Sequence, residues 1–191
     1  MNVIWKIDDS KAGYGPALIE PEVHKDDRGY FFESFREEEF KEKIADVNFV
    51  QENQSKSDYG TLRGMHCQIG NHAQAKLVSV SKGAVVDVIV DARRESENYG
   101  KVYAAYLSEE NHRQLFVPRG FLHGFLALRD NTIFQYKCDN YYCRESEASA
   151  NWESIDFNWL YYIRKEDIKL SYKDKNAFIF DKKKEFNIYY F

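Results

Sequence analysis

The fold is decided by the segment Lys76–Val90, which reads KLVSVSKGAVVDVIV. Its first part, Lys76–Val80, is mostly apolar and ends at Ser81-Lys82-Gly83, a combination typical of a tight turn. Its second part, Val85–Val90, is rich in β-branched residues, which favour extended strands because their side chains are stiff at χ1. The segment therefore predicts two short strands joined by a turn.

Further strands are expected downstream, separated by turn residues at 98–100, 118–120 and 130–131. These predicted strands are Val102–Leu107, Gln114–Val117, Phe121–Leu128 and Thr132–Tyr142. Many short strands without long intervening helices indicate an antiparallel sandwich or barrel. An all-β barrel of this size has room for one small ligand.

Two short helices are expected in addition. The first is Arg36–Asp46, where Phe40 and Ile44 lie four residues apart among charged side chains. Ser34 is a candidate N-cap for it, since a serine hydroxyl accepts a hydrogen bond from a free backbone N–H of the first turn. The second is expected around Ser171–Ala177.

Charge and length exclude several classes of protein. The 191 residues suit one domain, and the net charge of −4 gives no basic excess for a nucleic-acid backbone. No apolar run approaches the roughly 18 residues that a membrane span needs. Met1–Lys11 lacks the apolar stretch of a signal peptide, so we expect a cytoplasmic protein.

The cysteines and aromatic residues narrow the expectation further. The three cysteines, Cys67, Cys138 and Cys143, are odd in number and contain no CxxC pair, which argues against a disulfide framework or a Cys-rich zinc site. Aromatic residues make up 16% of the chain, with 14 Tyr and 14 Phe. Such residues favour strands, and they also provide stacking surfaces for flat ligands such as nucleobases.

The chemically most informative motif is LRGMHCQ at Leu62–Gln68, where Gly64 precedes His66 in a predicted strand region. A glycine there allows another group to approach the backbone closely. It belongs to an ordered series of motifs along the chain. The others are IEP at 19–21, DRGYFFE at 27–33, NQSKS at 53–57, QAKLV at 74–78, VPRGFLHGF at 117–125 and LSYKD at 170–174.

In this order the motifs resemble the nucleotide-sugar 3,5-epimerases of the cupin superfamily. The resemblance implies a double-stranded β-helix, or cupin jelly roll, and a homodimer. It implies a nucleoside-diphosphate 4-keto-6-deoxy sugar as substrate, for biosynthesis of a surface-polysaccharide deoxysugar, and chemistry without metal or redox cofactor. Residues 17–175 would form the catalytic core, with 176–191 as a C-terminal extension.

The resemblance also assigns the catalytic roles. A C4 ketone acidifies the hydrogens on C3 and C5, so inversion needs a base on one face, a cation at the enolate oxygen and an acid on the other face. His66 matches the family's base and Asp174 its carboxylate partner. Lys76 matches the lysine near the sugar, and Tyr136 matches the acid.

Further positions match substrate contacts of the family. Arginines suit the diphosphate, amides suit the sugar or base, and aromatic rings suit stacking. Phe31 and Glu33 match positions that often reach the nucleotide from the neighbouring subunit. The expected substrate-binding residues are Arg28, Phe31, Glu33, Gln51, Asn53, Arg63, His123 and Tyr142.

Several alternatives remain open at this level. The nucleotide can be dTDP, GDP or CDP, the sugar a hexose or a GDP-linked 4-keto-heptose, and inversion can occur at C3 alone. A 3,4-ketoisomerase of the same fold tends to carry His-x-His, where this chain has His66-Cys67-Gln68. A metal cupin would use His66, His72 and His123, but the usual ligand spacing is missing. A non-catalytic sugar-nucleotide binder is the last alternative.

Overall fold

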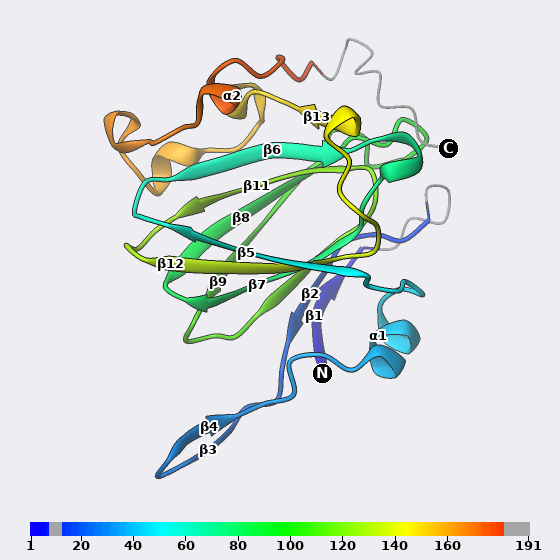
Figure 1. Cartoon of the computed structure of the whole chain (residues 1–191), viewed down its shortest axis with the longest axis vertical. Coiled ribbons are helices and arrows are strands. Elements are labelled where there is room, and N and C mark those ends of the chain that lie inside the picture. The colour runs from blue at the N-terminus through cyan, green and yellow to red at the C-terminus, as the bar shows by residue number, and fades with distance from the viewer. Residues whose placement is uncertain (8–12, 182–191) are drawn as a thin grey trace.

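The computed structural model describes residues 1–7 and 13–181, which form a sandwich of two β-sheets (Figure 1). The larger sheet has the spatial order β1 (Asn2–Lys6), β2 (Ala17–Glu20), β10 (Gln114–Val117), β7 (Lys76–Lys82), β12 (Thr132–Cys138) and β5 (Gln51–Ser57). The smaller sheet has the order β13 (Glu147–Ser149), β6 (Leu62–Gln68), β11 (Phe121–Ala127), β8 (Ala84–Asp91) and β9 (Val102–Ser108). Every pairing between these strands is antiparallel. The predicted all-β jelly roll is confirmed.

Short elements surround the two sheets. β3 (His24–Asp26) and β4 (Gly29–Phe31) form a hairpin that projects from the body (Figure 1). The α-helices of the described residues are α1 (Glu37–Lys43) and α2 (Tyr172–Lys175). The 3-10 turns are η1 (Gly70–His72), η2 (Arg144–Ser146), η3 (Trp152–Ser154), η4 (Trp159–Tyr161) and η5 (Lys165–Asp167). In the part of the chain described, neither α-helix approaches the length and apolar character required to cross a membrane.

Apolar residues fill three layers. The layer between the sheets joins Val78 and Phe134 of the larger sheet to Ile89 and Phe125 of the smaller one. The rings of Phe125 and Phe134 stack with centroids 4.1 Å apart. A second layer packs α1 on the outer face of the larger sheet through Phe40. Most aromatic residues with ring contacts thus serve packing, as strand propensity suggested.

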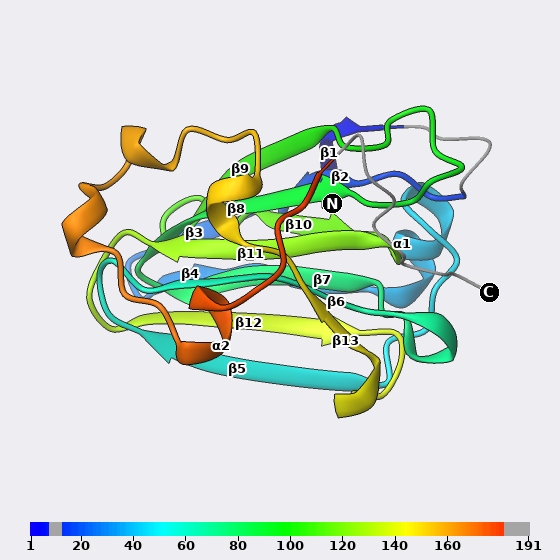
Figure 2. The same ribbon diagram turned by 90° about the horizontal axis from the view of Figure 1, so that it is seen from above.

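The third layer lies on the outer face of the smaller sheet. Residues 150–180 run across this face and bury Trp152, Trp159 and Phe180 against β6, β8 and β11. Figure 2 shows β13, α2 and the chain that follows α2 lying over β6 and β11. Because both of its faces are covered, β8 is buried along its whole length. This covering segment determines where the C-terminal site residues lie.

Most predicted element boundaries agree with the structure within a few residues. Gln114–Val117 is confirmed as a strand, and both predicted helices exist, in shorter form. The strand predicted over Thr132–Tyr142 is wrong beyond Cys138, where β12 ends. Ser34 does not cap α1, because Arg36 is the N-cap residue and makes no side-chain cap bond. The aromatic tail beyond residue 181 lies outside the described residues.

Candidate functional site

His66 lies in the middle of β6, between two antiparallel neighbours. It pairs with His123 of β11 on one side and with Ser149 of β13 on the other. At Gly64 the backbone has φ +127°, and a Cβ atom there would lie 2.4 Å from the Cα of Gly124. Only a glycine tolerates this conformation and this contact, so the close approach expected at the Gly64 motif is confirmed.

One ring nitrogen of His66 is held by Asp174 of α2. His66 Nε2 lies 2.6 Å from Asp174 Oδ1, and the Asp174 residue is only 3% exposed. The other carboxylate oxygen accepts a hydrogen bond of 2.7 Å from the Ser171 hydroxyl, and Ser171 also caps α2 by accepting from the Asp174 N–H. Burial by itself raises the pKa of Asp174, but the hydrogen bonds from His66 and Ser171 outweigh it, and the net pKa is lowered.

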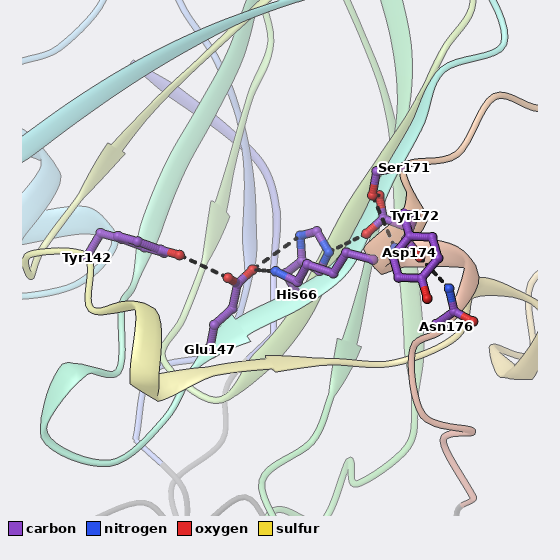
Figure 3. A network of polar contacts seen from close by, with 8 residues as sticks. His66, Tyr142, Glu147, Ser171, Tyr172, Asp174 and Asn176 are labelled. Carbon is purple, nitrogen blue, oxygen red and sulfur yellow. Dashed lines mark hydrogen bonds and ion pairs between the residues drawn. The ribbon is translucent and has the colours of Figure 1, made fainter.

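An acidic side chain stands on the other side of the imidazole. His66 Nδ1 lies 3.9 Å from Oε1 of Glu147, a residue of β13 (Figure 3). Glu147 is also ion-paired with Lys173 and accepts a hydrogen bond of 3.0 Å from the Tyr142 hydroxyl. Burial raises the pKa of Glu147, but Lys173 and His66 more than compensate, so the net pKa is lowered.

A cavity of about 250 Å³ opens beside these groups. It is lined by residues of both sheets, of the β6–β7 connection and of the β12–β13 connection, namely Gln51, Asn53, His66, Cys67, Gln68, Gln74, Lys76, Tyr136, Tyr142 and Glu147. Six of the twelve site residues expected from the sequence line this cavity. They are His66, Lys76, Tyr136, Gln51, Asn53 and Tyr142.

Lys76 and Tyr136 face the cavity from the larger sheet, whereas His66 faces it from the smaller one. Lys76 is on β7 and Tyr136 on the adjacent β12, with the Lys76 ammonium 5.8 Å from the centre of the Tyr136 ring. Burial raises the pKa of the Tyr136 phenol above its usual value, although the nearby charge of Arg63 opposes this. The phenol is therefore protonated at neutral pH and able to donate.

The amide side chains at one end of the cavity are ordered by hydrogen bonds. Gln51 donates to Asn53 Oδ1 at 3.1 Å, and Gln51 Oε1 accepts from the backbone N–H of Tyr142 at 3.1 Å. These contacts tie β5 to the Tyr142 loop. The two amides and the half-exposed Tyr142 ring thus offer polar and stacking groups at the mouth of the cavity.

Two predicted residues lie near the cavity without lining it. His123 is buried, and its Nε2 lies 2.9 and 3.0 Å from the two carboxylate oxygens of Asp87, which is fully buried on β8. Burial raises the pKa of Asp87 and outweighs the charges of His123 and Lys76, which lower it, so the net pKa is raised. Arg63 is held by the Ser57 hydroxyl at 3.0 Å and is close enough to influence Tyr136.

Three predicted substrate-binding residues lie away from the cavity of their own chain. Arg28 is in the β3–β4 hairpin, where it pairs with Asp26. Phe31 ends the same hairpin and is 71% exposed. Glu33 follows and pairs with Arg36. Figure 1 shows that the hairpin projects from the sandwich, and none of these three residues lines the cavity beside His66.

Within residues 1–7 and 13–181 no group of three or more His, Cys, Asp or Glu side chains is arranged to hold a metal ion. The two histidines that face each other across β6 and β11 each have a carboxylate partner, Asp174 for His66 and Asp87 for His123. None of the three cysteines, Cys67, Cys138 and Cys143, forms a disulfide within the described residues. Burial raises the pKa of the Cys138 thiol to about 11, so this thiol is a poor nucleophile at neutral pH.

Sequence reasoning missed Glu147, Lys173, Ser171 and Asp87 as members of the site. Lys173 and Ser171 lie inside the LSYKD motif that supplied Asp174, so the motif already contained the signal. Glu147 and Asp87 carry no local pattern. Their role follows from the pairing of β13 with β6 and of β8 with β11.

Comparisons with known proteins agree with this geometry. A family model described as dTDP-4-dehydrorhamnose 3,5-epimerase matches residues 14–182. The curated dTDP-4-dehydrorhamnose 3,5-epimerase of Salmonella typhimurium is 46% identical over 167 residues, which are 86% of this chain and 90% of the relative. The crystal structure of the enzyme of that name from Elizabethkingia anophelis has a TM-score of 0.84 and 46% identity, covering 94% of this chain and 96% of the other. A dTDP-6-deoxy-D-glucose-3,5-epimerase from Legionella pneumophila, crystallised with dTDP-4-keto-L-rhamnose, has a TM-score of 0.81 and 40% identity, covering 86% and 87%.

Proposed function

Because this chain belongs to the dTDP-4-dehydrorhamnose 3,5-epimerase family and is an epimerase of nucleotide-linked deoxysugars, we propose that it inverts C3 and C5 of a dTDP-4-keto-6-deoxy sugar through an enolate. The choice of dTDP is supported by the Legionella relative, which was crystallised with a dTDP-linked keto sugar. The observation that carries the proposal is a cavity with His66 on one wall and Lys76 and Tyr136 on the opposite wall. Inversion requires this arrangement, since one proton leaves from one face and another arrives at the other face.

In this proposal His66 is the base. The ionised carboxylate of Asp174 accepts the Nε2–H of His66 at 2.6 Å, which fixes the tautomer that leaves a lone pair on Nδ1. Nδ1 takes the proton from C3 or C5, and the resulting imidazolium is stabilised by Asp174. Glu147, with its Oε1 atom 3.9 Å from Nδ1, adds a second negative charge beside the imidazolium.

Lys76 stabilises the enolate that forms when the proton leaves. Its ammonium lies 5.8 Å from the centre of the Tyr136 ring, and its charge lowers the pKa of the buried Asp87. A fixed cation beside the C4 oxygen lowers the free energy of the developing negative charge more than that of the neutral ketone. Asp87 and His123 support Lys76 from behind the cavity.

Tyr136 returns a proton to the opposite face of the carbanion. Burial keeps its phenol protonated, and its position across the cavity from His66 suits delivery to the face that His66 does not reach. The phenolate that forms is then reprotonated from solvent, and the imidazolium of His66 releases its proton to solvent, so both groups are restored for the next inversion. Abstraction by His66 and donation by Tyr136 together give net inversion without any change in oxidation state.

The nucleotide end of the substrate is assigned to Gln51, Asn53, Tyr142 and Arg63, with the second copy of a homodimer completing it. The support for a dimer is the projecting hairpin, where Phe31 is largely exposed and the Arg28 side chain is 90% exposed. A planar guanidinium and an exposed ring suit a diphosphate and a nucleobase, respectively. Phe31 and Glu33 would enter the cavity of the partner.

We propose the cytoplasm as the compartment, because thiols remain reduced there and the three cysteines form no disulfide within the described residues. We also propose that residues 17–175 form the catalytic core of a single domain and that the product serves biosynthesis of a surface-polysaccharide deoxysugar. The mechanism assigns no step to a metal or a redox cofactor, because a base, an acid and a cation from the chain suffice for the two proton transfers.

The experiment that tests this function is incubation of the enzyme with 4-keto-6-deoxy sugar nucleotides in deuterated water, monitored by NMR. We expect deuterium at both C3 and C5 of the dTDP-linked sugar. Deuterium at C3 alone would show that the enzyme inverts only C3, and it would overturn the proposed inversion at C5. Exchange only with a GDP- or CDP-linked substrate would overturn the nucleotide assignment, and no exchange with any of the three would overturn the proposal.

A further inference from the structure

Asp174 is carried by a helix of four residues, α2, which is too short to hold its own geometry. An isolated helix needs about 12–15 residues to be even marginally stable in water. The Ser171 hydroxyl and the ion pair of Lys173 with Glu147 hold α2 locally, and the chain on either side of α2 adds to this support. The hydrogen bond to His66 is sensitive to the position of the Asp174 carboxylate, because 2.6 Å leaves little room for movement before the bond is lost.

On the N-terminal side of α2, the backbone of Lys169 is bonded to the start of β6. The Lys169 N–H donates to Gly60 O at 2.8 Å, and Lys169 O accepts from the Leu62 N–H at 3.0 Å. These two bonds attach the entry to α2 to the strand that carries His66. They leave the exit from α2 unrestrained, and that side needs an anchor of its own.

On the C-terminal side, residues 177–181 provide this anchor. The carbonyl of Phe178 accepts from the Asn151 N–H at 2.6 Å, and the Phe180 N–H donates to the Ser154 hydroxyl at 2.9 Å. Phe178 also forms a parallel bridge with Ala150, directly after β13. Since β13 pairs with β6 at His66, the exit of α2 and the base rest on the same strand pair.

Within this short segment, the Phe180 side chain differs from its two predecessors. Phe180 is 4% exposed and packs in the apolar layer that covers the smaller sheet, with its ring centroid 6.1 Å from that of Tyr99. Phe178 and Ile179 are 79% and 76% exposed. The apolar attachment of residues 177–181 to the sheet therefore depends on Phe180.

We propose that Phe180 is a positioning residue for epimerisation: it anchors residues 177–181 and thereby holds Asp174 against His66. This inference rests on the proposed function, in which Asp174 orients and stabilises the His66 base. Phe180 touches neither the cavity nor the reacting groups and acts through the four-residue helix.

The test compares Phe180→Ala with Phe178→Ala, which removes the same atoms from an exposed ring. We expect Phe180→Ala to lower kcat by about 10-fold or more, because the base loses part of its support, with KM changed less than about 3-fold. Phe178→Ala should keep both constants. Phe180→Leu, which retains most of the apolar volume, should recover most of kcat. Rates are expressed per folded site, quantified by near-ultraviolet circular dichroism at the assay temperature.

A double-mutant cycle with Asp174→Asn separates a positioning role from a general loss of stability. If Phe180 acts through Asp174, adding Phe180→Ala to Asp174→Asn lowers kcat no further, whereas independent effects multiply. A multiplied effect, or a wild-type kcat in Phe180→Ala, would overturn the inference. If the alanine variant does not fold, Phe180→Val, which also removes most of the ring, takes its place in the cycle. A wild-type kcat in Asp174→Asn alone would overturn the role of Asp174 on which the inference rests, whereas absence of epimerisation by the wild type would overturn the proposed function, so the failures are distinguishable.

Discussion

Asp174 Oδ1 lies 2.6 Å from His66 Nε2, although 108 positions separate these residues in the chain. One comes from a β-strand of the smaller sheet and the other from the segment that folds back over that sheet. Because Ser171 holds the second carboxylate oxygen, the acceptor aimed at the imidazole has one orientation. This contact sets the tautomer of His66 and directs its remaining lone pair, and the following predictions depend on it or on its supports.

Tyr136→Phe removes the proposed acid without changing the shape of the ring. We expect the variant to keep solvent deuterium exchange catalysed by His66 while inversion falls by about 10²-fold or more, because general acid catalysis contributes at least that factor. NMR of the sugar in deuterated water measures exchange and inversion in the same sample. Tyr141→Phe, at a residue 64% exposed, is the matched control. Equal loss of exchange and inversion in Tyr136→Phe would mean that another residue is the acid.

Gly64→Ala tests the close packing that places His66. The added Cβ would lie 2.4 Å from Gly124 Cα at a φ of +127°, so we expect the free energy of unfolding to fall by about 3 kcal/mol or more. Gly70→Ala is the control, because Gly70 also has a positive φ, +60°, but a Cβ there meets nothing within 4 Å. It should cost only about 1–2 kcal/mol of backbone strain. Urea unfolding measures both, and equal losses would contradict the packing argument.

Asp139 and Arg119 form an ion pair beside the proposed oxyanion-stabilising lysine. Asp139 accepts from the Ala75 N–H at 2.7 Å, next to Lys76, and from Arg119 Nε at 2.8 Å. Arg119 has a half-exposed side chain and that of Asp139 is 6% exposed. We expect Arg119→Gln to cost less than about 1 kcal/mol and Asp139→Ala about 1–3 kcal/mol, since the latter leaves a buried N–H without its acceptor. If chemical denaturation showed a larger loss of stability for Arg119→Gln than for Asp139→Ala, the role of Asp139 as acceptor for the Ala75 N–H would be contradicted.

The contact between Asp174 and His66 also makes stability depend on pH. The pKa of Asp174 is lower in the folded chain than in the unfolded chain, where it is about 3.9. Its ionisation therefore stabilises the fold above that value, and the contribution is lost as pH falls through the folded pKa. We expect the free energy of unfolding to fall more steeply for the wild type than for Asp174→Asn as the pH falls from about 5 to about 2. Asp46→Asn, on an exposed side chain, should follow the wild type, and parallel curves for wild type and Asp174→Asn would count against the contact.

Much of this structure was predictable from local sequence. The β-branched run Val85–Val90 and the turn residues on either side of it predicted strands at the correct positions along the chain, because those signals depend on neighbouring residues. Strands such as β5 were not predicted, since QENQSKS has the polar composition of a loop and becomes a strand by pairing with β12. The end of β12 was also missed. The Tyr142 loop leaves the sheet, and its backbone N–H at Tyr142 donates to Gln51 Oε1, a contact between residues distant in sequence.

The site was predictable to the extent that ordered motifs imply a family. His66, Lys76 and Tyr136 lie around one cavity, and Asp174 reaches His66 from outside its lining. Glu147 was not foreseen, because its place beside His66 arises from the pairing of β13 with β6. The hairpin residues Arg28 and Phe31 match the family in sequence, yet neither lines the cavity beside His66, and only the proposed dimer would give them a role there.

The most direct test of the central claim is site-resolved deuterium incorporation by His66→Ala. The account predicts that this variant still binds the dTDP-linked substrate, measured by calorimetry, and incorporates no deuterium at C3 or C5 above the uncatalysed rate. Exchange by His66→Ala at the wild-type rate would contradict the account, because the proton would then leave to a base other than His66.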